Sequence, residues 1–112
     1  MKPAAMRGAA AVRMLGVIFF AVFSAEAACA ATIKVRIENL AFAPAQVTAH
    51  VGDTIEWVND DFVGHSATAR DGTWDISLDP HSIGHILLRT SGKIAYFCKF
   101  HPDMAGVITV VK

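Results

Sequence analysis

Three side chains that can each bind a metal ion stand close together near the end of the sequence, between two segments with the pattern of β-strands. Cys98, His101 and Met104 are separated by two residues each, in a run that reads Cys-x-x-His-x-x-Met. Strand patterns on both sides make this run a short connection between strands. The rest of the chain is therefore expected to form a β-structure that holds these three groups at one end.

The chemistry of these donors favours copper. Cu(I) prefers thiolate and thioether sulfur, and imidazole binds both oxidation states of copper. Zinc usually takes four strong ligands and rarely accepts a thioether. His65, which lies 33 residues before Cys98 at the start of a strand-like stretch, supplies a second imidazole. Two histidines and a cysteine in a plane, with a weak axial methionine, make a blue-copper electron-transfer site.

A simpler interpretation of the same run involves no metal. Free cysteine and methionine are both common in protein cores, and histidine is often found at the surface. Three observations favour the metal site: the donor set is complete, the spacing is tight, and strand patterns flank the run. The other three histidines have no sulfur donor nearby and are expected at the surface or at strand edges: His50, His81 and His85. A second metal site at His81 or His85 is the less favoured alternative.

The first thirty residues have the features of a secretory signal peptide. Positive charges precede a ten-residue apolar run, residues 14–23, which is too short for a comfortable membrane span. The small residues Ala28-Cys29-Ala30 fit a cleavage site, with 25–27 as an alternative. We predict that residues 1–30 are a cleaved signal peptide, that 31–112 form one domain, and that the protein is periplasmic. An uncleaved membrane anchor is the less favoured alternative.

Charge and cysteine content narrow the possible partners of residues 31–112. This part carries seven Lys and Arg against nine Asp and Glu, a net charge of −2 without a basic cluster, so no nucleic-acid partner is expected. After cleavage Cys98 is the remaining cysteine, and a single thiol in an oxidising compartment needs an occupant. A metal ion is the simplest occupant, and a disulfide with Cys29 is the alternative if cleavage falls earlier.

Alternation of polar and apolar residues predicts β-strands along most of the mature part. In residues 32–38 the alternation is complete and turns Ile33, Val35 and Ile37 inward. Residues 70–83 have the weakest pattern, and we interpret Trp74 as a hydrophobic plug for this loop. Short strands between Gly and Pro turns, without a sustained helical period, predict an all-β sandwich. The expected strands are 32–38, 46–51, 54–58, 65–69, 85–89, 93–98 and 106–111.

Three segments of the chain resemble the cupredoxins, the small blue copper proteins: 51–59 (VGDTIEWVN), 65–68 (HSAT) and 96–104 (YFCKFHPDM). The Cys-x-x-His-x-x-Met spacing, with Pro after His, is similar to that of the amicyanins. The resemblance covers nearly all of 31–112 and implies a Greek-key β-sandwich with one type 1 copper ion. The copper ligands that it implies are His65, Cys98, His101 and Met104.

Two residues depart from the pattern of amicyanins and plastocyanins. Ser66 stands where those proteins have an asparagine that ties two loops together, and a hydroxyl is expected to do so less firmly. The backbone N–H of Ser66 is still expected to donate to the Cys98 sulfur. Gly64 precedes the first ligand, as in the azurins, and its carbonyl is an alternative axial donor to Met104.

These features favour an electron carrier that cycles copper between Cu(I) and Cu(II). A copper storage or delivery module is the alternative, although such modules favour methionine-rich segments and residues 31–112 contain only Met104. We do not expect an enzyme, because Phe97 and Lys99 flank Cys98 where blue copper oxidases and reductases often have histidines. The expected partners are transient redox proteins, such as a c-type cytochrome or a periplasmic dehydrogenase. We expect a monomer without stable membrane association after cleavage.

Overall fold

The computed structural model describes residues 16, 18 and 29–112. The predicted signal peptide, residues 1–30, lies almost wholly outside the described residues. Within the described part the regular structure consists of strands alone. No helix there is long and apolar enough to cross a membrane.

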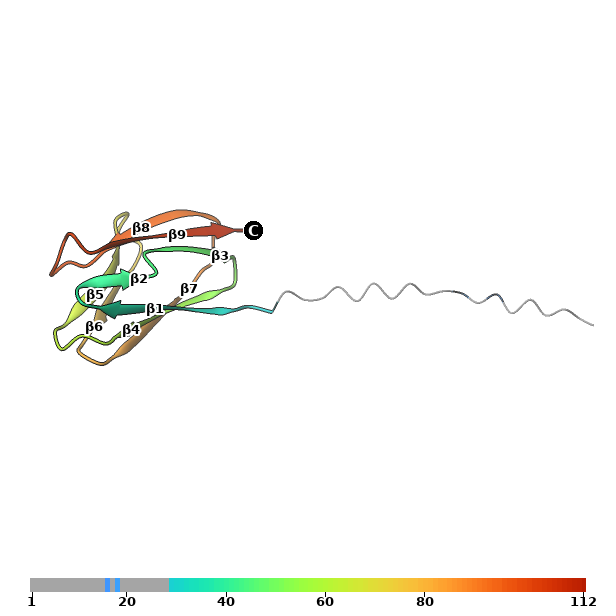
Figure 1. The fold of residues 1–112 in the computed structure, drawn as a ribbon. Helices are drawn as coiled ribbons and strands as arrows, with labels where there is room; N and C mark the ends of the chain where they lie inside the picture. Colours follow the sequence, from blue (N-terminus) through green and yellow to red (C-terminus); the bar gives the residue numbers. More distant parts are fainter. Residues whose placement is uncertain (1–15, 17, 19–28) are drawn as a thin grey trace, which may run out of the picture.

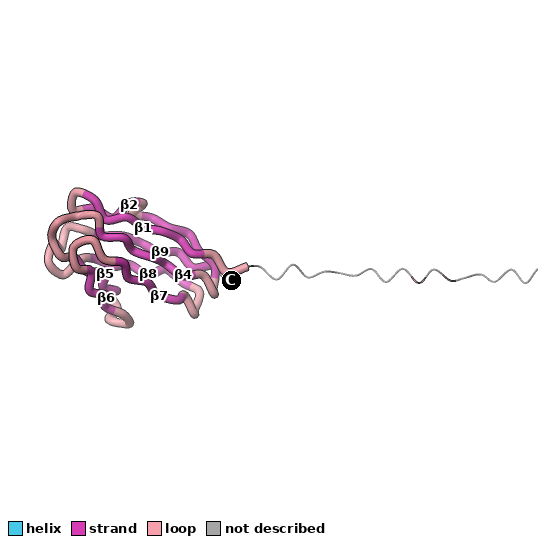
Figure 2. Tube along the Cα trace, turned by 90° about the horizontal axis from the view of Figure 1, so that it is seen from below, coloured by secondary structure: helices cyan, strands magenta, loops and turns pink. Residues whose placement is uncertain are grey.

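Two β-sheets pack face to face, and their strands run along a common direction (Figures 1 and 2). The all-β sandwich expected from the sequence is therefore confirmed. β1 pairs with β4 in parallel, as does β3 with β9, and the other ladders are antiparallel. One sheet has the order β2 (Ala41–Ala43), β1 (Thr32–Glu38), β4 (Thr54–Asn59), β7 (Ile83–Leu87), and the other β3 (Gln46–His50), β9 (Ala105–Val111), β8 (Gly92–Phe97), β5 (His65–Ala69), β6 (Asp75–Leu78).

The inward-facing residues of the alternating strands form the core, as the sequence predicts. Val35, Ile37 and Trp57 are fully buried between the sheets. The indole N–H of Trp57 donates to the hydroxyl of Tyr96 over 3.3 Å, and burial raises the pKa of Tyr96 to about 12. Trp74 lies against both rings, with centroid distances of 5.4 and 5.7 Å, which confirms its interpretation as a plug.

The largest differences from the predicted strands concern β2, β6 and β7, and the other strand bounds agree within one residue. β2 and β6 lie in segments predicted to be irregular, because runs of three and four residues are too short to give a clear strand pattern. β6 is nevertheless held as an edge strand by its ladder with β5. β7 begins at Ile83, two residues earlier than predicted, because Val58 of β4 pairs with Ile83 and extends the ladder.

Asp53 closes the end of the sandwich at which the C-terminus lies. Its carboxylate accepts the backbone N–H of Ala31 over 2.9 Å and that of His50 over 2.8 Å. Its carbonyl accepts the N–H of Leu88 over 2.8 Å. The hydrogen bond from Ala31, with that from His50, holds the pKa of Asp53 below its usual value. The carboxylate of Asp53 thus joins the beginning of β1 to the end of β3, and its backbone carbonyl adds the chain after β7.

Candidate metal centre

The predicted ligands meet at the other end of the sandwich. His65 is the first residue of β5, Cys98 follows β8, and the connection from β8 to β9 carries His101 and Met104 (Figure 1). The donor atoms of His65, Cys98 and His101 all lie within 4.8 Å of one another. Residues 33 positions apart in sequence are therefore brought into one cluster.

The spacing of the three donor atoms fits a trigonal metal site. The Nδ1 atoms of His65 and His101 lie 3.7 and 3.8 Å from the Sγ atom of Cys98. Metal-to-ligand lengths of about 2.0 Å for nitrogen and about 2.3 Å for sulfur give a nitrogen-to-sulfur distance of about 3.7 Å in a trigonal plane, against about 3.5 Å in a tetrahedron. A plane of two imidazoles and a thiolate is the arrangement that suits copper in a blue site.

Burial differs sharply between the two histidines. His65 and Cys98 are buried, whereas His101 is half-buried and follows Phe100, whose side chain is 63% exposed. Met104 is buried in the same core cluster as Cys98. The cluster thus has a shielded interior side and one imidazole near the solvent.

Two backbone hydrogen bonds close the loop between β8 and β9 on itself. The N–H of Cys98 donates to the carbonyl of Met104 over 3.0 Å, and the N–H of Met104 donates to the carbonyl of His101 over 2.8 Å. The backbone positions of the three donor residues are therefore fixed relative to one another by the loop itself.

Ser66 bridges the gap where β5 and β8 separate. The two strands pair only at Thr68 and Ala69 of β5, so their ladder ends before the metal cluster. Beyond it, the N–H of Ser66 lies 3.4 Å from the Cys98 sulfur, as the sequence predicts. The Ser66 hydroxyl accepts the N–H of Lys99 over 2.9 Å. The serine side chain therefore ties the two ligand segments together.

A line of polar groups that the sequence analysis did not predict continues from Ser66 to the surface. The hydroxyls of Ser66 and Thr68 are 2.9 Å apart, and Thr68 donates to Asp75 over 2.8 Å. The Lys99 ammonium lies 2.6 Å from the other oxygen of Asp75. The hydrogen bond from Lys99, with that from Thr68, lowers the pKa of Asp75. Asp75 was missed because it lies in the segment with the weakest pattern.

Asp61 is a second residue that sequence reasoning missed. One of its carboxylate oxygens lies 2.8 Å from Nε2 of His65, on the side of the ring away from Cys98. Burial alone would raise the pKa of Asp61, but hydrogen bonds from Leu40, His65 and Asn39 outweigh it and lower the pKa. A carboxylate four residues before a ligand histidine was the available signal.

The remaining histidines stand apart from this cluster, as predicted. His50, His81 and His85 are all exposed, and none joins a group of metal-binding side chains in the described part of the chain. The ring of His81 instead packs edge-on against Phe62, with centroids 5.1 Å apart.

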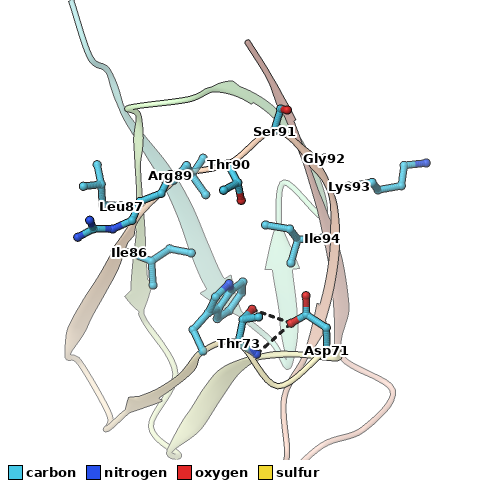
Figure 3. Close-up of a pocket in the computed structure, with 12 residues that line it drawn as sticks. Asp71, Thr73, Ile86, Leu87, Arg89, Thr90, Ser91, Gly92, Lys93 and Ile94 are labelled. Carbon is cyan, nitrogen blue, oxygen red and sulfur yellow. Dashed lines mark hydrogen bonds between the residues drawn. The ribbon is translucent and has the colours of Figure 1, made fainter.

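A surface hollow lies at the far end of β8 from Cys98, between β7 and β8. Ile86 and Ile94 point into it, whereas the charged ends of Arg89 and Lys93 point away (Figure 3). Asp71 bonds to the hydroxyl and N–H of Thr73 beside the hollow. No histidine or cysteine lines this hollow, and among the described residues it holds no group of metal-binding side chains.

Comparison with known proteins agrees with this geometry. A family model described as a cupredoxin-like domain matches residues 11–110. The reduced state of an amicyanin variant is similar, with 23% identity, a TM-score of 0.64, and coverage of 71% of this chain and 82% of that one. A purple cupredoxin from Nitrosopumilus maritimus has 24% identity, a TM-score of 0.64, and coverage of 70% and 99%.

A larger protein contains a similar domain. The copper-containing nitrite reductase from Thermus scotoductus SA-01 has 26% identity and a TM-score of 0.65, but the match covers 72% of this chain and only 22% of the reductase. The likenesses to solved structures indicate the same sandwich, and the family model spans nearly the whole chain. The protein therefore belongs to the cupredoxin-like family.

Proposed function

We propose that this protein binds one copper ion through His65, Cys98, His101 and Met104 and carries single electrons between other proteins. The observation that carries the proposal is the trigonal spacing of two imidazole nitrogens around one buried thiol. The thioether of Met104, buried in the same core cluster as Cys98, supplies the axial donor. Copper in such a site supplies one-electron chemistry by alternating between Cu(I) and Cu(II).

The protein holds the donor atoms of the site rigidly on its buried side and leaves the ring of His101 near the solvent. Hydrogen bonds to His65, the Cys98 sulfur and the loop backbone keep the donor atoms in place. The half-buried ring of His101 beside the exposed Phe100 gives electrons a short route to the surface. A small apolar contact suits transient redox partners, whose interfaces bury less than about 1,200 Å².

We also propose that residues 1–30 are a signal peptide removed on export to the periplasm, leaving a monomer formed by residues 31–112. Partners such as a c-type cytochrome or a periplasmic dehydrogenase suit an exported carrier. An enzymatic role is not proposed, because one domain with one copper has no second site at which a substrate would react. Copper storage or delivery is the alternative, and the completeness of the ligand set in a rigid site disfavours it.

The test is the visible spectrum of the protein loaded with Cu(II). The wild-type protein should be intensely blue or violet through charge transfer from the Cys98 thiolate, and Cys98→Ser should be colourless. His85→Gln is the control and should keep the colour, because His85 is exposed and lies outside the metal cluster. A wild-type protein that takes up zinc but shows no thiolate-to-copper charge-transfer band with Cu(II) would contradict the electron-carrier proposal.

A further inference from the structure

We infer that Asp61, held by the turn at Asn39 and Leu40, fixes the orientation of the His65 ring and keeps its proton on Nε2 before any metal ion binds. The part of this inference that concerns copper rests on the proposed function. The part that concerns the imidazole of His65 applies to the metal-free protein and can be tested separately.

The contact between Asp61 and His65 determines which ring nitrogen carries the proton. Nε2 of His65 lies 2.8 Å from Oδ2 of Asp61, and a carboxylate oxygen can only accept a hydrogen bond. In the neutral ring the proton therefore sits on Nε2. The lone pair is then left on Nδ1, which is the atom 3.7 Å from the Cys98 sulfur. The ring is thus held in the tautomer that a metal ion needs.

Asp61 is itself held by three further hydrogen bonds, two to its carboxylate and one from its backbone N–H. Its Oδ1 accepts the N–H of Asn39 over 2.8 Å, and its Oδ2 accepts the N–H of Leu40 over 3.0 Å. Its own N–H donates to Oδ1 of Asn59 over 3.0 Å. Asn59 is fully buried, and its amide donates to the carbonyls of Val63, Leu78 and Asp79. The carboxylate has little freedom to leave His65.

The turn that holds Asp61 has an unusual backbone. Asn39 and Leu40 connect β1 to β2, and both have positive φ angles, 51° and 62°. Two residues with positive φ suit a tight hairpin, but a leucine in this conformation is uncommon and unfavourable. Such a turn points successive N–H groups at one anion. Here that anion is the carboxylate beside His65, so the unfavourable turn has a role at the metal cluster.

The expected consequence of this contact is a higher affinity for Cu(II) and a lower reduction potential. A carboxylate behind a ligand histidine orients the ring and makes it a stronger donor. Its negative charge also favours Cu(II) over Cu(I), which lowers the reduction potential. Removing the charge should therefore raise the potential and weaken Cu(II) binding.

The first experiment uses nitrogen-15 NMR of the metal-free protein. In the wild type, the His65 ring should carry its proton on Nε2, and this proton should exchange slowly with water. In Asp61→Asn the Nε2 proton should exchange faster, or the tautomer should change. Asp60→Asn is the matched control: Asp60 pairs with Arg36 at the surface and does not touch His65, so the wild-type pattern should persist. The wild-type spectrum decides the point even if Asp61→Asn fails to fold.

The second experiment measures Cu(II) affinity and reduction potential at fixed pH. Asp61→Asn should bind Cu(II) about ten- to a hundredfold more weakly and show a higher potential, whereas Asp60→Asn should show at most a small shift. A wild-type ring protonated on Nδ1, or an Asp61→Asn protein with unchanged affinity and potential, would overturn the inference. If the wild type shows no blue band but His65 has the expected tautomer, the proposed function fails and the positioning of His65 stands.

Discussion

At the scale of single residues, we propose Met104 as the axial donor, and its exchange leaves the two histidines and Cys98 in place. In Met104→Gln a harder oxygen replaces the thioether, which should favour Cu(II) and lower the reduction potential. The colour should persist, because the two histidines and Cys98 remain. Voltammetry of the copper-loaded protein measures the effect.

Met104→Leu separates ligation from packing in the same experiment. Leucine keeps the apolar volume of this buried site but offers no donor, so the potential should move upward instead. Equal potentials in the wild type and both variants would mean that Met104 only fills the core. The carbonyl of Gly64 would then be the remaining candidate for the axial position.

At this scale the sequence identified three side chains that the structure brings together, His65, Cys98 and His101, but not the residues that support them. Cys98, His101 and Met104 lie within seven residues, and a histidine after a polar loop is easy to find. The contact between Asp61 and His65 depends on how the loop between β4 and β5 folds and on a turn in another strand pair. Such contacts have no local pattern, because the partners meet only after the sheets have assembled.

At the scale of the strands, Gly106 of β9 is required by the ring of Tyr96 across the ladder from β8. A Cβ atom at position 106 would lie 2.5 Å from that ring, and the ring is held by Trp57 and Phe42. Gly106→Ala should therefore lower the free energy of unfolding by about 1–3 kcal/mol, the usual cost of overpacking. Urea denaturation of the metal-free protein measures this change.

Gly84→Ala in β7 is the comparison for this prediction. Its Cβ would meet aliphatic side-chain atoms of Ile76 and Leu78, at 2.6 and 2.9 Å, and Ile76 is only partly buried, so it has more room to shift than the Tyr96 ring. The loss of stability should be smaller than for Gly106→Ala. A larger loss at Gly84 would show that the aromatic cluster around Tyr96 is less rigid than its packing indicates.

The strands themselves were predictable where one face is buried. β1 matches its predicted bounds because alternating residues meet the core along its whole length. β2 and β6 were missed because both are short, three and four residues, and are held by pairing with a neighbour. Pairing of a short edge strand depends on the partner strand, which no local window contains.

Asp53 links several strands, and its effect on stability should depend on pH. Its folded pKa is lowered, so the ionised carboxylate stabilises the fold above its unfolded value of about 3.9, and this contribution is lost as the pH falls toward the folded pKa. Asp53→Asn should thus unfold at a lower temperature than the wild type at pH 7. The difference should shrink at pH 3.

Thermal unfolding of the metal-free proteins at both pH values checks this expectation. Asp79→Asn serves as the control, because Asp79 is an exposed residue. A gap between wild type and Asp53→Asn that stays constant from pH 7 to pH 3 would contradict the role given to the ionised carboxylate.

At the scale of the whole molecule, the two ends of the sandwich perform different tasks. One end gathers the proposed metal donors at the start of β5 and on the connection after β8, and the other is closed by Asp53 near the start of β1 (Figure 1). The predicted cleavage site lies at this second end. Removal of the leader would therefore act far from the cluster that binds the metal.

Cleavage after Ala30 would change the chemistry of the bond between Ala31 and Asp53. The donor 2.9 Å from the carboxylate would become a charged ammonium group in place of a peptide N–H. The nearby carboxylate raises the pKa of this amine, so the gain in stability is present below about pH 7.7 and fades as the pH rises through the folded pKa. A protein beginning at Ala31 with a free amine should unfold at a higher temperature at pH 6 than its acetylated form.

At pH 10, and in the Asp53→Asn background, the free-amine protein should be no more stable than the acetylated one. Equal stability of the two proteins at pH 6 would refute the ion pair. The precursor would then be the less stable form of the same chain. A polypeptide that must stay unfolded during export across a membrane benefits if its folded state lacks one stabilising ion pair. Cleavage of the leader after export would create the Ala31 ammonium group and so allow the ion pair with Asp53 to form.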